Sequence, residues 1–465
     1  MKQSKHKNFA TELRIIEQLE SFKQHKVTLE ACPGEAYLTK SKKEYQLSFE
    51  GIFPYSEDKK IKILINGEPF TIKSTDFQKP TRSRLAEIPA QHTFDIDGVN
   101  KGNLNNSSFF RMFFFDDSKR TNIFHYKLEK PKHDGIIPWA FDCVRLAVMK
   151  KSYDITQNRN GENSYFIIEN LDAVTLEEFE EDSYAIQKGI GFLIGYMPGG
   201  ENYIFSGENF IYQRLARNSL KSIFHPVTSN PYSKLFKEKE KEIADNYYGK
   251  LKVIPAPVIS ELINQLRQNM DFSVAIIFLM EVASLKSIVS MPGVFSVILE
   301  SFANIIIIKQ NKQEKLINDK DLVAKIIYEM NTLIDKHAPK INPEAEIKIR
   351  RRINEINKPV NLNRLTNAEK LRAPFDQLKI KLTAEEEKAL DYRNYLLHGN
   401  ILMNNELERT SEEIDNHMLH VSAKLYTLIS KLILKSCGYE GYVINYSKFY
   451  QKNSINSKED YFEYI

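Results

Sequence analysis

The chain has 465 residues, 42% of them hydrophobic and 27% charged, so it can bury a large core and is too long for one comfortable domain. Its 65 Lys and Arg residues against 61 Asp and Glu residues give a net charge of +4, which excludes a surface that binds nucleic acid through overall charge alone. Three widely spaced cysteines exclude a disulfide framework and a CxxC zinc site, and we expect a reduced, cytoplasmic protein without a secretion signal.

Alternating apolar and polar residues dominate the first half of the chain, from about residue 27 to residue 205. The clearest runs are Tyr45, Leu47, Phe49 and Ile61, Ile63, Ile65. Such alternation predicts strands with one face turned inward. Asn66 and Gly67 stand between two runs and predict a tight hairpin, because Asn-Gly accepts the positive φ angles of that turn. Further strands are predicted at residues 109–115, 123–128, 165–168 and 190–196. We therefore expect a β-rich, sandwich-like N-terminal domain.

Residues 272–308 are apolar enough to raise the question of a membrane span. They contain Glu281, Lys286 and Glu300, and the Pro-Gly pair at 292–293 divides them into segments shorter than a comfortable span. We expect buried helices here and no membrane partner.

Beyond Pro255 and Pro257 the apolar spacing changes from that of a strand to that of a helix, so we place the domain boundary near residue 250. Two helical stripes follow, Leu322, Ile326, Met330, Leu333 and Ile414, Met418, Val421, Leu425, Leu428, Leu432. Capping boxes are predicted for Thr366 with Glu369, Thr383 with Glu386 and Thr410 with Glu413. The chain is thus predicted as α+β and multidomain: a β-rich domain at 1–250, an all-α helical bundle at 251–440 and a C-terminal tail at 441–465.

The helical half contains the segment Asp-Tyr-Arg-Asn-Tyr-Leu-Leu-His-Gly-Asn at residues 391–400, where His398 follows Arg393 by five residues. Metal-independent RNA cleavage needs a base for the ribose 2′-OH, an acid for the leaving 5′ oxygen and a cation for the charged phosphorane. His and Arg can supply these roles, and Asn394 can orient the Arg or a phosphate oxygen. Residues five apart are separated by roughly 140° on a straight helix, so we expect the helix to end here with Gly399 as its cap.

Arg120 and His125 have the same spacing in a strand-like stretch without a following Asn or Gly, and we interpret that copy as chance. From spacing alone, Arg393 and His398 fit a surface Arg and a helix-capping His as well as they fit a catalytic pair. The wider segment is what favours the catalytic interpretation.

The RNxxxH segment resembles the signature of the HEPN superfamily, small all-α domains that carry Arg, a polar residue, three variable residues and His, often followed by Gly. The resemblance covers roughly residues 258–437 and is strongest to the Apea-like, abortive-infection branch, because the order of helices around the segment is the same. It implies a metal-independent endoribonuclease of anti-phage defence that needs no cofactor and acts on RNA, possible substrates including tRNA, as a homodimer. It also implies that Arg393, Asn394 and His398 are catalytic and that the products carry 2′,3′-cyclic phosphate and 5′-hydroxyl ends.

Residues near this segment are candidates for supporting roles. Tyr392 and Tyr395 can stack on a base, or they can pack in the core. Glu281 and Glu300 can hold the guanidinium of Arg393, or they can be partly exposed carboxylates at a helix edge.

A local RNA-binding footprint is predicted at Arg350, Arg351 and Arg352. Nine basic and four acidic residues lie between Lys340 and Arg372, a local net charge of +5, although a solvated helix face is the alternative. His417 and His420 lie three residues apart on the last helix, but no third ligand accompanies them. We therefore predict exposed polar positions and no metal site.

The β-rich half shows no catalytic constellation. We predict a sensor or regulatory domain that keeps the ribonuclease inactive until a phage-derived trigger or the substrate binds. A function of another class stays open: a non-catalytic HEPN dimerisation or adaptor module, or a nucleotide-binding one. An enzyme would expose the RNxxxH segment in a basic cleft, whereas an adaptor would have it plugged by neighbouring side chains.

Overall fold

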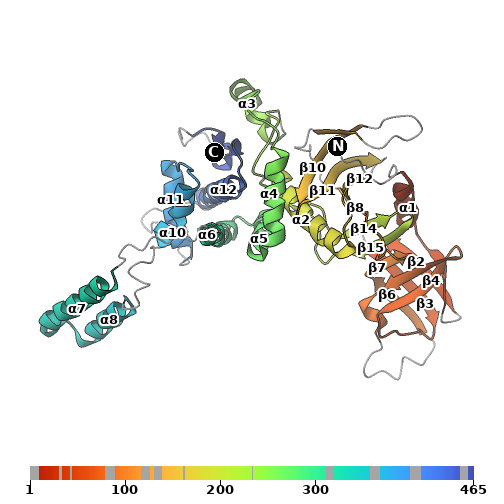
Figure 1. Cartoon of the computed structure of the whole chain (residues 1–465), viewed down its shortest axis with the longest axis horizontal. Helices are drawn as coiled ribbons and strands as arrows, with labels where there is room; N and C mark the ends of the chain where they lie inside the picture. Colours follow the sequence, from red (N-terminus) through yellow and green to blue (C-terminus); the bar gives the residue numbers. More distant parts are fainter. Residues whose placement is uncertain are drawn as a thin grey trace.

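The computed structural model describes residues 10–30, 34–41, 44–78, 90–116, 126–129, 139–160, 163–232, 234–309, 319–356, 367–397, 410–450 and 459–465. Antiparallel strands fill the first part of the chain and helices fill the second, as the sequence predicts (Figure 1).

The strands β1 to β7 form a closed barrel, called the ring below. They are β1 (His25–Leu29), β2 (Glu35–Ser41), β3 (Glu44–Gly51), β4 (Lys60–Ile65), β5 (Glu68–Lys73), β6 (Ala90–Ile96) and β7 (Gly98–Lys101). Only Asp97 separates β6 from β7, and its N–H donates to the carbonyl of Lys73 at 2.8 Å. Because β6 pairs with β3 while β7 pairs with β5, this bent strand closes the pairing order β3, β2, β1, β4, β5. Closure leaves these strands without free edges.

The β4–β5 hairpin confirms the prediction made from Asn66 and Gly67. Both residues have positive φ angles, 53° and 82°, as a two-residue turn of this kind requires. Ile61 and Ile63 pair with Ile72 and Phe70 across the hairpin. The inward side chains of these strands belong to a buried cluster inside the ring.

The rest of the large sheet continues from β7. Its strands are β8 (Arg111–Phe115), β9 (Tyr126–Glu129), β10 (Trp139–Val148), β11 (Lys151–Asn160), β12 (Asn163–Asn170), β14 (Glu201–Ser206) and β15 (Asn209–Arg214), and after β7 the order is β15, β14, β8, β12, β11, β10, β9. Phe113 faces the cluster inside the ring, whereas Met112 and Phe114 face the helices. The sheet is therefore covered on both sides, which explains why apolar residues run continuously through β8.

Helix α1 (Ala10–Glu20) is fixed to the ring side of the sheet by buried ion pairs. Arg111 on β8 lies 2.8 Å from Glu12 and 2.7 Å from Glu169 on β12. Near the other end of the helix, Lys40 pairs with Glu20 at 3.3 Å and also with Glu201. These contacts set the position of α1 because a buried charge that loses its partner is costly.

The strand predicted at residues 190–196 is wrong. Residues Leu176–Ile194 form helix α2, and only Tyr196–Met197 form a short strand, β13, paired with β16 (Leu220–Lys221). The helix begins at a capping box between Thr175 and Glu178 and ends at Gly195, whose φ of 69° is the left-handed conformation of a C-terminal cap. Its apolar run resembled a buried strand because the helix is buried along most of its length.

The helical part is assembled around a long final helix. Its elements are η3 (Lys234–Lys239), α3 (Glu240–Tyr247), α4 (Ala256–Gln268), α5 (Met270–Leu285), α6 (Met291–Lys309), α10 (Asn367–Gln377), α11 (Ala384–Leu397) and α12 (Ser411–Ser436). The capping boxes of Thr383 and Thr410 are confirmed. The predicted box at Thr366 lies outside the described residues. Helix α6 packs against α5, α10, α11 and α12, and the stripe predicted on α12 is largely buried.

The change from strands to helices near residue 250 does not interrupt the core. One cluster of buried residues runs from the outer face of the sheet through α2 and α4 to α12. Ser260 and Asn264 on α4 accept backbone N–H bonds from the end of β10 and the turn after it, at 3.0 and 2.8 Å. The C-terminal residues predicted as a tail also join this core, through β17 (Tyr442–Ile444), α13 (Tyr446–Phe449) and β18 (Phe462–Tyr464).

Helices α7 (Lys320–His337) and α8 (Pro343–Ile356), linked by the short helix η4 (Ala338–Lys340), form a hairpin that stands away from the rest of the helices in Figure 1. A small cluster of Val323, Ile327 and Ile353 holds the hairpin together. The predicted stripe on α7 does lie on a helix, but Leu322 and Leu333 are 46% and 60% exposed. The residues that pack the hairpin are offset by one position from that stripe.

The apolar residues 272–308 form α5 and α6, which pack into the core as predicted. Among the described residues no single helix is both long and apolar enough to cross a membrane, while α4 and α5 pass that test only as a pair bent by 109°.

Candidate active site

Helix α11 carries the start of the RNxxxH segment. It begins at the capping box of Thr383 and Glu386 and packs against α6 and α12. Arg393 and Asn394 lie in its last described turns, as does Tyr395, but the side chains of these three residues are outside the described part. His398 and Gly399 also lie outside the described residues. The predicted catalytic geometry and the predicted helix cap therefore remain predictions.

A groove of about 1170 Å³ runs beside α11. Tyr392 lines it from α11, His417 and His420 line it from α12, and residues 459–464 of the C-terminal segment form part of its wall. Five acidic residues and four lysines line the groove. The lining is thus mixed in charge, unlike the basic cleft expected for an RNA-binding active site.

An imidazole from α12 contacts the aromatic residue that precedes Arg393. The rings of Tyr392 and His417 have centroids 5.9 Å apart and lie almost perpendicular. His417 and His420 are half-buried, so the prediction that they occupy exposed positions is wrong. Burial first, and then the positive charge of Lys424, lower the pKa of His420 below 6.5. His420 is therefore uncharged at neutral pH and can accept or donate a hydrogen bond in the groove.

A buried network of charges fastens α11 and the C-terminal segment to α12. Lys431 on α12 lies 2.6 Å from Glu386 on α11 and also pairs with Glu463. Lys424, two turns earlier, lies 2.6 Å from Glu459 and 3.6 Å from Glu463. Three carboxylates thus surround two ammonium groups, and Lys431, Glu459 and Glu463 of this network also line the groove.

Burial and charge pull the pKa values of this network in opposite directions. Burial raises the pKa of Glu386, and the attraction of Lys431 offsets only part of that shift. Burial alone would lower the pKa of Lys431, but its attraction to Glu386 and Glu463 outweighs burial and raises it. Burial would raise the pKa of Glu459, but its hydrogen bond from Lys424 lowers it on balance. Lys431 therefore remains charged at neutral pH, because two carboxylates hold it.

This network was not predicted from the sequence. Its signal was the seven-residue spacing of Lys424 and Lys431, which places both on one face of a helix that is otherwise apolar there. A lysine pair on the buried face of an amphipathic helix requires carboxylate partners from neighbouring elements.

Two other predicted site residues, Glu281 and Arg350, do not line the groove. Glu281 is exposed on α5 and pairs with Arg217 at 3.0 Å, which agrees with the alternative of an exposed carboxylate at a helix edge. Arg350 on α8 pairs with Asp335 at 2.6 Å and with Glu346 at 2.8 Å within the α7–α8 hairpin.

The two arginines that follow complete the predicted RNA-binding footprint. Arg351 is exposed on the same helix. The side chain of Arg352 is outside the described part. The predicted footprint therefore lies on the hairpin, which stands away from α11 in Figure 1.

Within the described ranges, His, Cys, Asp and Glu side chains form no group of three or more that could hold a metal ion. Comparisons with protein families, with curated proteins and with solved structures found no match for this chain.

Proposed function

We propose that the helical part is a metal-independent endoribonuclease of the HEPN type, with Arg393, Asn394 and His398 as its catalytic residues. The observation that carries the proposal is the position of the RNxxxH segment: its first two residues lie on α11 directly after Tyr392, which lines a groove large enough for a nucleotide. The resemblance of the segment to the HEPN signature supplies the chemistry.

The proposed reaction is transfer within one RNA strand. The ribose 2′-OH loses its proton to a base and attacks the adjacent phosphorus, and the 5′ oxygen leaves with a proton from an acid. His398 exchanges these protons, and the guanidinium of Arg393 stabilises the charged phosphorane. Asn394 orients Arg393 or a phosphate oxygen. The bond that breaks leaves a 2′,3′-cyclic phosphate on one product and a 5′-hydroxyl on the other.

The proposed partners are RNA, a second copy of the chain and a phage-derived trigger, in a cytoplasmic defence role. The dimer is supported by an apolar face on α5, where Met270, Val274 and Phe278 follow helical spacing and are 75%, 55% and 42% exposed. A second copy would cover this face. Light scattering of the purified protein tests it: we expect a dimer that Val274→Asp converts to a monomer, and a monomeric wild type would contradict it.

A non-catalytic adaptor is the second candidate, and one observation favours it. Glu459, Asp460 and Glu463 of the C-terminal segment line the groove. Carboxylates in that position repel a phosphate backbone. In this alternative the groove is closed by the chain itself, and the RNxxxH segment only supports packing.

Incubation of the purified protein with total RNA and with tRNA in EDTA separates the two candidates. We expect cleavage by the wild type and none by the Arg393→Ala, His398→Ala double variant. The chain offers a matched control, Arg120→Ala with His125→Ala, which removes the same pair of residues at the same spacing and should leave cleavage unchanged. Equal cleavage by wild type and the Arg393, His398 variant would refute the site.

A further inference from the structure

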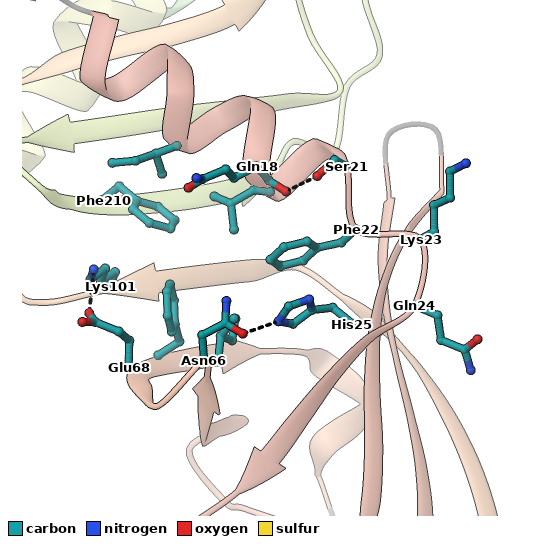
Figure 2. Close-up of a pocket in the computed structure, with 14 residues that line it drawn as sticks. Gln18, Ser21, Phe22, Lys23, Gln24, His25, Asn66, Glu68, Lys101 and Phe210 are labelled. Atoms are coloured by element: carbon teal, nitrogen blue, oxygen red, sulfur yellow. Dashed lines mark hydrogen bonds and ion pairs between the residues drawn. The ribbon is translucent and has the colours of Figure 1, made fainter.

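A second cavity, of about 620 Å³, lies in the β-rich part, between the end of α1, the start of β1 and the β4–β5 hairpin (Figure 2). This size is in the range of pockets that hold nucleoside-sized or drug-sized molecules. In Figure 1, α1 lies far from α11, so the cavity is separate from the groove beside the RNxxxH segment.

The floor of the cavity is apolar and largely aromatic. Leu19, Ile65 and Phe210 are buried, and the side chains of Phe210 and Phe22 point toward the same space from opposite sides (Figure 2). Phe22 already stacks on His25, with ring centroids 4.4 Å apart and an angle of 11° between the planes. The surroundings therefore suit a flat ring, since aromatic side chains pack such rings through offset or edge contacts.

Amide side chains stand around this floor. Gln18 on α1 and Asn66 at the hairpin tip are exposed at the rim, and Asn66 Oδ1 lies 3.2 Å from Nε2 of His25. An amide carries both donors and an acceptor, so it can match either kind of group on the edge of a heterocycle. Lys101 and Glu68 form an ion pair of 2.7 Å at the opposite wall. Lys23 also lines the cavity, but its side chain points away from Phe22 and His25 in Figure 2. Because Lys101 and Glu68 neutralise each other, the interior suits an uncharged ring better than a phosphate group.

The body of the β4–β5 hairpin has no free edge in the described residues. β1 pairs with Ile63 and Leu64 of β4, and β7 pairs with Thr71–Lys73 of β5. An extended peptide therefore cannot add as a further strand along that part of the hairpin.

We propose that this cavity binds a nucleobase, an uncharged heteroaromatic ring with hydrogen-bond donors and acceptors along its edge. Stacking on Phe22 holds the ring above the buried floor of Leu19, Ile65 and Phe210, and the amides of Gln18 and Asn66 hydrogen-bond to its edge. The base belongs either to a free nucleotide or to a single-stranded RNA. The proposal does not depend on the ribonuclease proposal, because it uses none of the residues assigned to cleavage.

Calorimetric titration of the full-length protein tests the proposal with five small probes: adenosine, guanosine, cytidine and uridine 5′-monophosphates, and ribose 5-phosphate, which lacks a base. Hexamers of each nucleotide with 2′-O-methyl ribose, which cannot be cleaved through a 2′-OH, form a second arm. We expect at least one base-bearing probe to bind and ribose 5-phosphate not to bind. Binding of the mononucleotide identifies a free ligand, and binding of a hexamer alone identifies a base within a strand.

Three variants assign the binding to the cavity. Gln18→Ala and Asn66→Gly each remove one amide and should weaken binding by about three- to tenfold. Gly accepts the positive φ of position 66, so the turn is preserved. Arg14→Ala, an exposed position one turn earlier on α1 that does not line the cavity, is the matched control and should bind as the wild type does. The proposal would be overturned if no base-bearing probe binds up to about 1 mM, or if both amide variants bind as tightly as the wild type.

Discussion

Replacing Lys431 with Met should destabilise the helical part strongly. The side chain of Lys431 is 2% exposed, and its ammonium group lies 2.6 Å from the carboxylate of Glu386, whose side chain is 0% exposed. Met fills most of the space but leaves Glu386 and Glu463 without their shared cation. Breaking a buried pair on one side costs about 3–5 kcal/mol, because the remaining carboxylate is buried without compensation. Urea unfolding followed by circular dichroism should show a loss of that size in the free energy of unfolding.

An exposed pair on α11 itself provides the control. Lys388 lies 2.8 Å from Glu385, and both side chains are well exposed, so Lys388→Met should leave the free energy of unfolding almost unchanged. Glu386→Gln keeps the capping box, because Gln can bond the same backbone N–H. Adding it to Lys431→Met should restore part of the lost stability, since it removes one of the stranded charges. If Lys431→Met is as mild as Lys388→Met, the charge network does not hold α11 and the C-terminal segment together.

Two further predictions concern other parts of the molecule. The pKa of His420 is lowered in the folded state, so the unfolded chain binds more protons as the pH falls below 6.5, and stability that is present above that pH is lost. His420→Gln should therefore flatten the dependence of the urea midpoint on pH between about 7 and 5. An unchanged slope would contradict this prediction. Arg111→Leu should leave Glu12 and Glu169 buried without a cation and lower the free energy of unfolding by about 3–5 kcal/mol. It should also make α1 sensitive to limited proteolysis, and a variant as resistant to protease as the wild type would argue against the pairing.

Local sequence signals predicted much of the fold. Asn66 with Gly67 fixed a hairpin because the turn depends on only two backbone conformations. The capping boxes of Thr383 and Thr410 marked helix starts because their bonds join residues three apart. The end of helix α2 was misassigned as a strand although Thr175 and Glu178 carried the same capping signal, because a short apolar run alone does not distinguish a buried helix from a buried strand.

Features that depend on distant contacts were not predictable from local patterns. The ring closes only because the strand around Asp97 bends and pairs on its two halves with β3 and β5. The exposed stripe on α7 was correct as a helix but not as a packed face, since packing is decided by α8. Lys431 finds its carboxylates on α11 and in the C-terminal segment. Spacing on one helix cannot name partners that lie elsewhere in the chain.

Cleavage of an RNA oligonucleotide in EDTA, beside its copy with 2′-O-methyl ribose, tests the proposed attack by the 2′-OH most directly. If Arg393 and His398 catalyse that attack, the RNA should be cut to products with 2′,3′-cyclic phosphate and 5′-hydroxyl ends, and the methylated copy should remain intact. Cleavage of both oligonucleotides, or products with 3′-hydroxyl and 5′-phosphate ends, would contradict the proposed mechanism.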